Sequence, residues 1–404
     1  MAEEVNIVIS HQNTVVNRSF PANYHDLRRV SSTLYSMLHH QWACLDTSHA
    51  RHTAQLLLRS GRHGDSSVEF LFGYETPASY DFRSGGIMPL RATCKQPKQF
   101  ENQPAVTIPP NLLPGITFAQ PGNTSDTPPY FPGDDEPDEI DGENLVTTAG
   151  NCCGHLDRNN RANGDAINLP LGYVDLPKDN VRIVLKALEH DARFKCHQQP
   201  LSWALDFPLY TAVSDSDRIT IALNLVQAVL KFHSTPWWRS TGCVLDLVSF
   251  FSPQSPANTT SNNEDDLASS LDTLHISTPV DYHHNQPNAS PPTPPEDDEI
   301  AKWAEENHGI RNLTLYSLGV ALLQIGLWDG SVSWSDHVQV RRKTARLSYL
   351  GKKYRNAARR LIECNFGQDS DDLEDEKLQR AVFTSVVGDL EALQKMVARS
   401  EATY

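Results

Sequence analysis

The 404-residue chain has no apolar run that approaches the roughly 20 residues of a membrane-spanning helix. Hydrophobic residues make up only 39% of it, and its 26 prolines outnumber its 21 glycines. A segment that is poor in apolar side chains and rich in proline cannot bury enough surface to fold. The composition therefore predicts no membrane span, and it predicts that part of the chain does not pack.

Basic residues are also scarce, because 35 Lys and Arg face 50 Asp and Glu, for a formal net charge of −15. A sequence-independent grip on nucleic acid or on an anionic membrane needs a cationic surface, so the charge argues against both partner classes. The seven cysteines are odd in number and scattered, which gives no disulfide framework. We expect a reducing, cytoplasmic environment.

Two segments interrupt the patterned parts of the chain, at about 95–150 and about 252–300. Both mix prolines with acidic and small polar residues, a composition typical of disorder. They could carry a docking motif or a phosphorylation site, but a tolerated surface insertion is the simpler interpretation. We expect both to be disordered inserts, the second a dispensable loop, and residues 1–23 to form a flexible tail.

Between these segments the periodicity indicates helices and strands. Apolar residues at helical intervals predict a helix over 24–42, and the runs 51–61 and 66–75 read as two strands joined by a Gly-containing turn. A helix over 214–233 has Ser214 or Ser216 as its N-cap and ends before Pro236. "VLDLVSFF", containing Asp246, looks like a further strand, and "VRIVLK" ends at Lys186.

The segment 313–328 is apolar on nearly every face and too short to cross a membrane, so it should lie at the centre of a helical domain. Gly319 would permit close approach of a neighbouring helix. Two helices follow, one near 352–366 that Asn365 or Gly367 would cap, and one over 373–397.

Five motifs follow one another along the chain: "LYSMLHHQWACLDTSHARHTAQLLL" (34–58), "HSTPWW" (233–238), "RNLTLYSLGVALLQIG" (311–326), "YRNAARRLIECNFG" (354–367) and "AVFTSVVGDLEAL" (381–393). Together they resemble a fungal protein-kinase-like domain of unknown function that is often found C-terminal to prion-inhibition or HeLo domains. The resemblance runs from about residue 24 to 397 and skips the two inserts. It implies that 313–328 is similar to the central helix of a kinase large lobe.

The resemblance places "HSTPWW" where a kinase carries its catalytic loop, yet the catalytic Asp, the metal-binding Asp-Phe-Gly and the Gly-rich loop are absent. Lys186 stands too close to His233 in sequence to serve as the phosphate-pairing lysine. Thr314 replaces the Asp that braces the loop, and Gln324 replaces a common Glu. We interpret Trp237 and Trp238 as packing groups. A stacking site for a ligand is the alternative.

The sequence therefore predicts an α+β, protein-kinase-like two-lobe fold. The expected small mixed N-terminal lobe spans 24–200, and the mainly helical C-terminal lobe spans 201–404. We expect a non-catalytic interaction or regulatory module, with an unknown protein partner and with no nucleotide or other cofactor. The candidate structural or interaction residues are Trp237, Trp238, Pro236, Tyr316 and Gly319. A divergent phosphotransferase that uses Asp246 or an acid from an insert, with Lys186 on phosphate, is one alternative. A structural remnant of a HeLo-associated signalling protein is another.

The sequence disfavours metal binding. Cys152, Cys153 and His155 in "NCCGH" offer ligand atoms, but a structural zinc site needs four, and no second pair lies nearby in the sequence. A second set flanks Trp42 and Cys44, and it reads more simply as polar ends of a helix and a strand: His39, His40, His49 and His52.

One charged run remains. Nine basic residues lie between Arg341 and Arg360, and six acidic residues follow between Asp369 and Glu376. The basic run could bind an anionic partner. Solvated helix faces that neutralise each other are the favoured interpretation.

Overall fold

The structure of the chain is a computed structural model. It describes residues 19–40, 42, 44, 49, 51–60, 65–75, 87–95, 144–145, 153–154, 170–176, 180–189, 191–207, 213–238, 242–252, 265–280 and 297–401. Residues 1–18, most of the expected insert at 95–150 and parts of the one at 252–300 lie outside these ranges.

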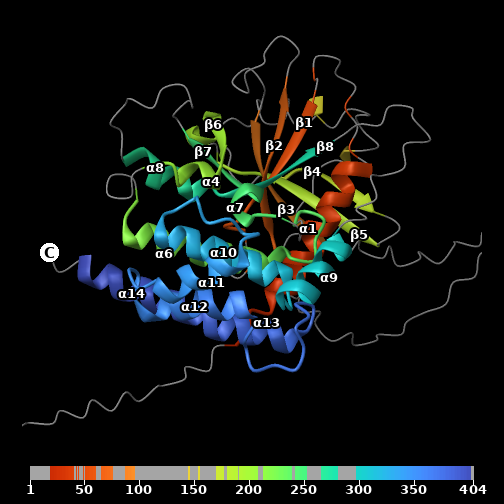
Figure 1. Cartoon of the computed structure of the whole chain (residues 1–404). Helices are drawn as coiled ribbons and strands as arrows, with labels where there is room; N and C mark the ends of the chain where they lie inside the picture. Colours follow the sequence, from red (N-terminus) through yellow and green to blue (C-terminus); the bar gives the residue numbers. More distant parts are fainter. Residues whose placement is uncertain are drawn as a thin grey trace, which may run out of the picture.

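Eight strands form one sheet in the order β4-β5-β3-β2-β1-β8-β7-β6, and every neighbouring pair is antiparallel. The sheet stands above the helical layer in Figure 1. The strands are β1 (Arg51–Leu57), β2 (Val68–Glu75), β3 (Ile87–Lys95), β4 (Pro170–Leu176), β5 (Val181–Ala187), β6 (His197–Pro200), β7 (Val248–Ser252) and β8 (His275–Val280).

Helices make up the rest of the described fold, so the α+β class is confirmed. α1 packs on β2, β3 and β5 of the sheet and on α6 of the helical layer. The helices are α1 (Asn23–His40), α4 (Leu201–Ala204), α6 (Asp215–Phe232), α7 (Val244–Leu247), α8 (Asp265–Ser270), α9 (Asp297–His308), α10 (Leu313–Leu327), α11 (His337–Arg346), α12 (Gly351–Glu363), α13 (Glu376–Val382) and α14 (Gly388–Glu401). Shorter helical turns are η2 (Ala192–Lys195), η3 (Leu271–Thr273) and η4 (Phe383–Val387).

The predicted N-terminal elements are confirmed. α1 buries Leu27, Leu34 and Met37 on one stripe, and β1 pairs with β2 as a hairpin. Phe20, which the sequence assigns to a flexible tail, packs on α1, because its ring meets Tyr24 edge-on at a centroid distance of 5.3 Å. The same ring also packs against α13–α14, so the chain is anchored before α1 begins.

α6 begins where the sequence indicates. Ser214 accepts a hydrogen bond from the Asp217 backbone N–H, and the Asp217 carboxylate accepts one from the Ser214 N–H, which forms a capping box. The helix ends at Phe232, before Pro236. α6 contacts α1, which packs on the sheet, and it also contacts α10 and α14.

α10 confirms the predicted buried helix, and all of its residues from Leu315 to Gly326 are buried. Asn312 caps its start by accepting a hydrogen bond from the Leu315 N–H, and Trp328 ends it in the left-handed conformation. α10 packs against α6 and α12, and α14 packs in turn against α6 and α12. The helical layer is thus built around α10, as expected.

The predicted C-cap of α12 is wrong. The capping position belongs to Cys364, which takes the left-handed conformation with φ 46°. Asn365 follows it and donates its backbone N–H to the Arg360 carbonyl. The next helix also differs from an ideal one, because a π turn, η4, interrupts it between α13 and α14.

The largest correction concerns 252–300. This segment contains α8, η3 and β8, and β8 lies inside the sheet between β1 and β7. Ile276 and Val280 of β8 are 0% and 2% exposed. The expectation of a dispensable loop is therefore wrong for 265–280, and the sheet takes strands from both sides of residue 200.

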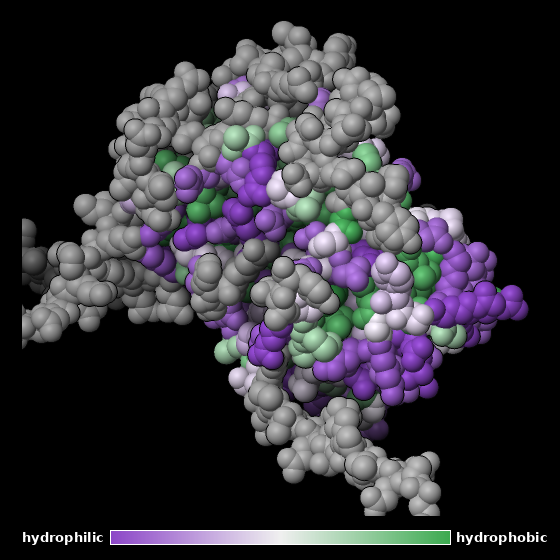
Figure 2. Space-filling view, turned by 90° about the vertical axis from the view of Figure 1, so that its left-hand side faces the viewer, coloured by the Kyte–Doolittle hydropathy of each residue, from purple (hydrophilic) through white to green (hydrophobic). Residues whose placement is uncertain are grey.

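Among the described residues, no single helix is long and apolar enough to cross a membrane. α9 and α10 would be long and apolar enough only if taken together, and the chain bends by 71° between them. On the face shown in Figure 2, hydrophilic side chains cover most of the described surface of the helical layer.

Candidate functional site

The loop after α6 occupies the position that the resemblance assigns to a catalytic loop, and Trp237 fills it. The Trp237 side chain is 2% exposed, and its Nε1–H donates to the backbone carbonyl of Ser31 on α1 over 2.8 Å. Its ring also meets Tyr35 edge-on at 5.6 Å. Trp237 therefore joins α1 to the end of α6, which supports the packing interpretation.

Trp238 and Pro236 lie beside it with different environments. Trp238 is 6% exposed and its backbone N–H bonds to Thr235, whereas Pro236 is exposed. A base or ring ligand stacks on an open aromatic face, and neither indole offers one. The stacking site that we weighed as an alternative is not formed by this loop.

His233 caps the end of α6, and its protonation is opposed by its surroundings. Burial lowers the pKa of this imidazole, and the nearby positive charge of Arg28 lowers it further. Glu374 lies 3.4 Å away and acts in the opposite direction. The imidazole Nδ1 meets the Val229 carbonyl at 3.0 Å, so the ring has a structural place at the helix end.

α10 braces this loop through Ser317. The Ser317 hydroxyl donates to the Gly242 carbonyl over 2.6 Å, whereas the resemblance had pointed to position 314. Tyr316 turns away from the loop: its hydroxyl contacts the Trp334 carbonyl at 3.1 Å and His337 Nδ1 at 2.7 Å. Burial raises the pKa of Tyr316, so its hydroxyl remains a neutral group of the core.

Gly319 marks the closest approach of α10 to α12. A Cβ built at this position would lie 2.7 Å from Ile362 Cγ1 and 2.8 Å from the Ile362 backbone nitrogen. Only glycine fits between these two helices, as the sequence indicated. Tyr316 and Gly319 are therefore parts of the helical core, separate from the Trp237 loop.

Lys186 and Asp246, the residues of the phosphotransferase alternative, lie far apart. Lys186 is on β5, and Asp246 is an exposed residue of the short helix α7, which contacts β6 and β7. The sequence pattern predicts a strand at Asp246, and this prediction is wrong, because the residue lies on a helix. Five strand spacings of about 4.8 Å separate β5 from β7, or roughly 24 Å across the sheet. This separation disfavours joint action of Lys186 and Asp246 on one phosphate group.

The nine basic residues lie on α11 and α12, where the only acidic residue between 337 and 363 is Glu363. Two of them form ion pairs, Lys343 with Asp329 at 2.7 Å and Arg360 with Asp389 at 3.6 Å. Seven have no ion-pair partner anywhere in the part of the chain that the structure describes: Arg341, Arg342, Arg346, Lys352, Lys353, Arg355 and Arg359.

The acidic run does not neutralise them, contrary to our expectation. Its ion pairs within 297–401 and with α6 join Asp371 to Arg311, Glu374 to His233 and Glu376 to Arg380. None of these partners belongs to the basic run. A positive surface thus persists on a chain whose net charge is negative, and we call this surface of α11 and α12 the basic surface.

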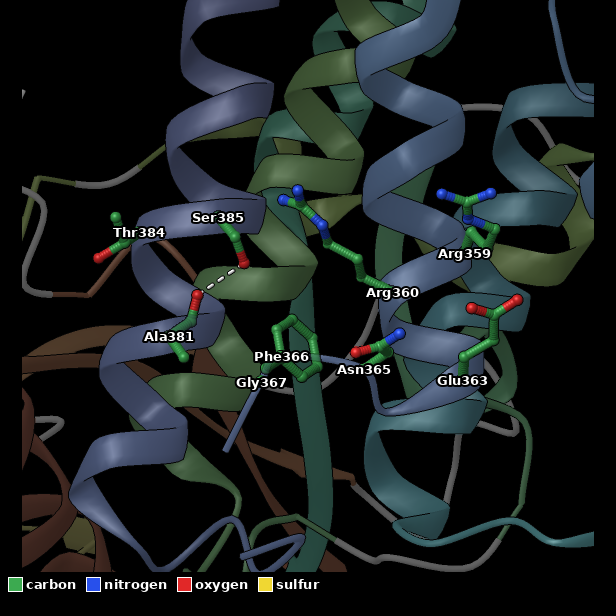
Figure 3. Close-up of a pocket in the computed structure, with 9 residues that line it drawn as sticks. All are labelled: Arg359, Arg360, Glu363, Asn365, Phe366, Gly367, Ala381, Thr384 and Ser385. Carbon is green, nitrogen blue, oxygen red and sulfur yellow. Dashed lines mark hydrogen bonds between the residues drawn. The ribbon is translucent and has the colours of Figure 1, made fainter. Parts of the chain in front are cut away.

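Two grooves indent the basic surface, one on each side of α12. The groove between α11 and α12 encloses about 340 Å³ and is lined by Arg341, Arg355 and Arg359. The second encloses about 460 Å³ between α12 and the α13–α14 segment, and Figure 3 shows its lining residues. Arg359 and Glu363 line both grooves. The basic surface is therefore hollowed along α12.

A cluster of cysteine and histidine side chains lies around the start of β1, far in sequence from the basic surface. Cys44 Sγ lies 3.2 Å from His49 Nδ1, which lies 3.3 Å from His52 Nε2. His52 Nε2 in turn lies 3.2 Å from Cys153 Sγ. All four atoms lie within 4.8 Å of one another. These residues could hold a metal ion.

Proximity in sequence does not reveal this cluster, because one of its four ligands is distant along the chain. Cys153 comes from a position 101 residues after His52. The signal that could have raised the question was the spacing Cys44-x₄-His49-x₂-His52, which puts three ligand atoms in one short segment. His39 and His40 end α1 as predicted, with His39 stacked on Tyr35. Cys152 and His155 lie outside the described residues.

Comparison of the chain with family models, with curated proteins and with solved structures finds no match. The kinase-like resemblance therefore depends on the motifs in the sequence.

Proposed function

We propose that the chain is a non-catalytic, kinase-like module that binds an acidic segment of a partner protein. The observation that carries the non-catalytic assignment is the burial of Trp237 at the catalytic-loop position. A kinase needs a carboxylate and a metal-binding acid in that place, open to substrate. A large apolar ring hydrogen-bonded to α1 leaves no room for either.

The binding surface in this proposal is the basic surface with its two grooves. Arginine side chains recognise carboxylates through paired hydrogen bonds, and Arg355 and Arg359 have no ion-pair partner among the described residues. Charge segregation on an otherwise acidic chain supports attraction of an acidic partner at long range. The acidic excess elsewhere on the chain disfavours nucleic acid, whose backbone would meet repulsion beyond the basic surface.

A thermal melt with Mg-ATP tests the non-catalytic assignment. A ligand present at a hundred times its dissociation constant stabilises a fold by about 2.7 kcal/mol. We expect millimolar Mg-ATP to leave the melting temperature unchanged. A clear upward shift that Lys186→Ala or Asp246→Asn abolishes would instead establish the phosphotransferase alternative.

Fluorescence anisotropy with a labelled poly-glutamate peptide tests the binding surface. We expect binding that weakens as salt rises, and the double variant Arg355→Glu, Arg359→Glu should abolish it. Lys377→Glu with Lys395→Glu is the matched control, because it changes the net charge equally at exposed positions outside the grooves. Equal binding by both double variants contradicts the proposal, and so does tighter binding of a single-stranded oligonucleotide than of the peptide.

A further inference from the structure

We propose that Cys44, His49, His52 and Cys153 bind one Zn²⁺ ion that fastens the segment around Cys153 to the α1–β1 junction. This inference is independent of the proposed function, because the four residues lie outside both the Trp237 loop and the basic surface. It depends on the convergence of four ligand atoms from two separate parts of the chain, residues 44–52 and Cys153.

Three of the six distances between these atoms are close to those of a tetrahedral zinc site, and the other three are below 4.8 Å. Zinc binds cysteine sulfur at about 2.3 Å and histidine nitrogen at about 2.0 to 2.1 Å, so tetrahedral edges are about 3.3 Å between nitrogens and about 3.6 Å between nitrogen and sulfur. The two histidine nitrogens are 3.3 Å apart, and each sulfur lies 3.2 Å from a nitrogen. Since the tetrahedral edge between two sulfurs is about 3.8 Å, side-chain adjustments of up to about 1 Å would complete the geometry.

The donor set selects the metal. Two thiolates with two neutral imidazoles suit Zn²⁺, whereas Mg²⁺ and Ca²⁺ prefer oxygen ligands. On binding, the thiols of Cys44 and Cys153 release their protons to solvent and each sulfur donates an electron pair to the ion. His49 coordinates through Nδ1 and His52 through Nε2, so each ring keeps its proton on the other nitrogen.

Neighbouring groups hold the ligands in place. The indole N–H of Trp42 donates to Cys153 Sγ over 3.3 Å, a contact that stabilises a thiolate. His49 stacks on Tyr74 at a ring distance of 3.7 Å, and His52 stacks on Phe72 at 5.5 Å. These contacts fix both imidazole planes before any metal arrives, as a structural site requires.

Burial indicates a structural role and an entry path. His52 and Cys153 are 3% and 0% exposed, whereas Cys44 and His49 are half-buried, so an ion would enter from their side. Four protein ligands fill a tetrahedral shell and leave no position for a substrate. The ion would therefore link β1 to the distant Cys153 segment rather than catalyse a reaction.

Metal analysis of the full-length chain tests the proposal directly. After expression in zinc-supplemented medium and desalting under reducing conditions, mass spectrometry of the metal content should find about one zinc per chain. Cobalt replacing the zinc should give the intense visible bands of a tetrahedral site together with a thiolate charge-transfer band. A strong zinc chelator should lower the melting temperature, and added zinc should restore it.

Paired cysteine variants locate the site. Cys44→Ser should lose the bound zinc and the charge-transfer intensity of one thiolate, whereas Cys94→Ser, also half-buried, should keep both. If Cys44→Ser does not fold, the metal content and the cobalt spectrum of the unmodified chain decide the matter. Any of three results overturns the proposal: less than about 0.1 zinc per chain, full zinc retention in Cys44→Ser, or a Cys44–Cys153 disulfide that persists under reducing conditions.

Discussion

β8 lies inside the sheet and α10 lies inside the helical layer, yet only α10 could be predicted from the sequence. Each lies between packed neighbours: β8 between β1 and β7, and α10 between α6 and α12. The 15 residues of α10 are mostly apolar, and this run predicts a buried helix. β8 has only Ile276 and Val280 as aliphatic residues, inside a stretch of proline, serine and asparagine. A helix makes its hydrogen bonds locally, whereas a strand depends on partners elsewhere in the chain.

The removal of β8 should have the largest effect on the fold. Replacing 265–280 with a Gly/Ser linker of equal length removes the pairings of β8 with both β1 and β7, which splits the sheet. We expect the cooperative thermal transition, followed by circular dichroism, to disappear. The same replacement of 253–264 is the control and should leave the transition nearly unchanged. A cooperative transition in both chains would show that β8 is dispensable after all.

Truncation of α10 should come next. Leu322 is 0% exposed, and its backbone carbonyl accepts a hydrogen bond from the Tyr354 hydroxyl. Leu322→Ala should lower the free energy of unfolding by about 2 to 5 kcal/mol, because it leaves a cavity in the core. Denaturant unfolding measures this loss. Leu327→Ala, at the half-buried end of the same helix, should cost less, and equal losses would contradict a core centred on α10.

The limits of sequence reading follow from the same contrast. The apolar stripes and the Ser214 cap located α1, α6 and α10 because helix signals lie within a few residues of each other. The alternating pattern also located β1 and β2. The composition of 252–300, averaged over the segment, concealed β8, because six residues of strand are a small part of it.

The candidate sites divide in the same way. The packing role of Trp237 and the fit of Gly319 could be inferred, since both follow from residue type and local position. The cluster around His52 could not, because Cys153 reaches it only through the fold. The persistence of the basic surface was also missed, because charge neutralisation depends on which side chains meet in space.

Acid should weaken β8 through His275. Burial lowers the pKa of His275 to about 4, below the ordinary value of 6.5, and its ring stacks on Phe251. Between pH 6.5 and pH 4, the unfolded chain therefore binds a proton at His275, whereas the folded chain does not. Stability from this group is complete above pH 6.5 and is lost as the pH falls toward 4. The loss should be on the order of 3 kcal/mol.

Denaturant unfolding between pH 7 and pH 4.5 measures this dependence. His275→Phe keeps an aromatic ring against Phe251 and removes the titrating group, so its stability should fall less steeply over this range. Other groups titrate equally in both proteins, so the difference in slope isolates position 275. Identical slopes would mean that His275 takes up its proton without leaving the core.

The cap of α10 should have the smallest effect. Asn312 accepts a hydrogen bond from the Leu315 N–H over 2.8 Å, and its side-chain amide donates to the Asp371 carbonyl over 2.9 Å. Asn312→Ala should cost about 1 kcal/mol in denaturant unfolding, the usual value for a lost N-cap. Asn312→Asp keeps the accepting oxygen and removes only the donor, so it should recover most of that loss. If both variants lose the same free energy of unfolding, the hydrogen bond to the Asp371 carbonyl holds the start of α10. In that case even a helix that local sequence predicts depends on a distant partner.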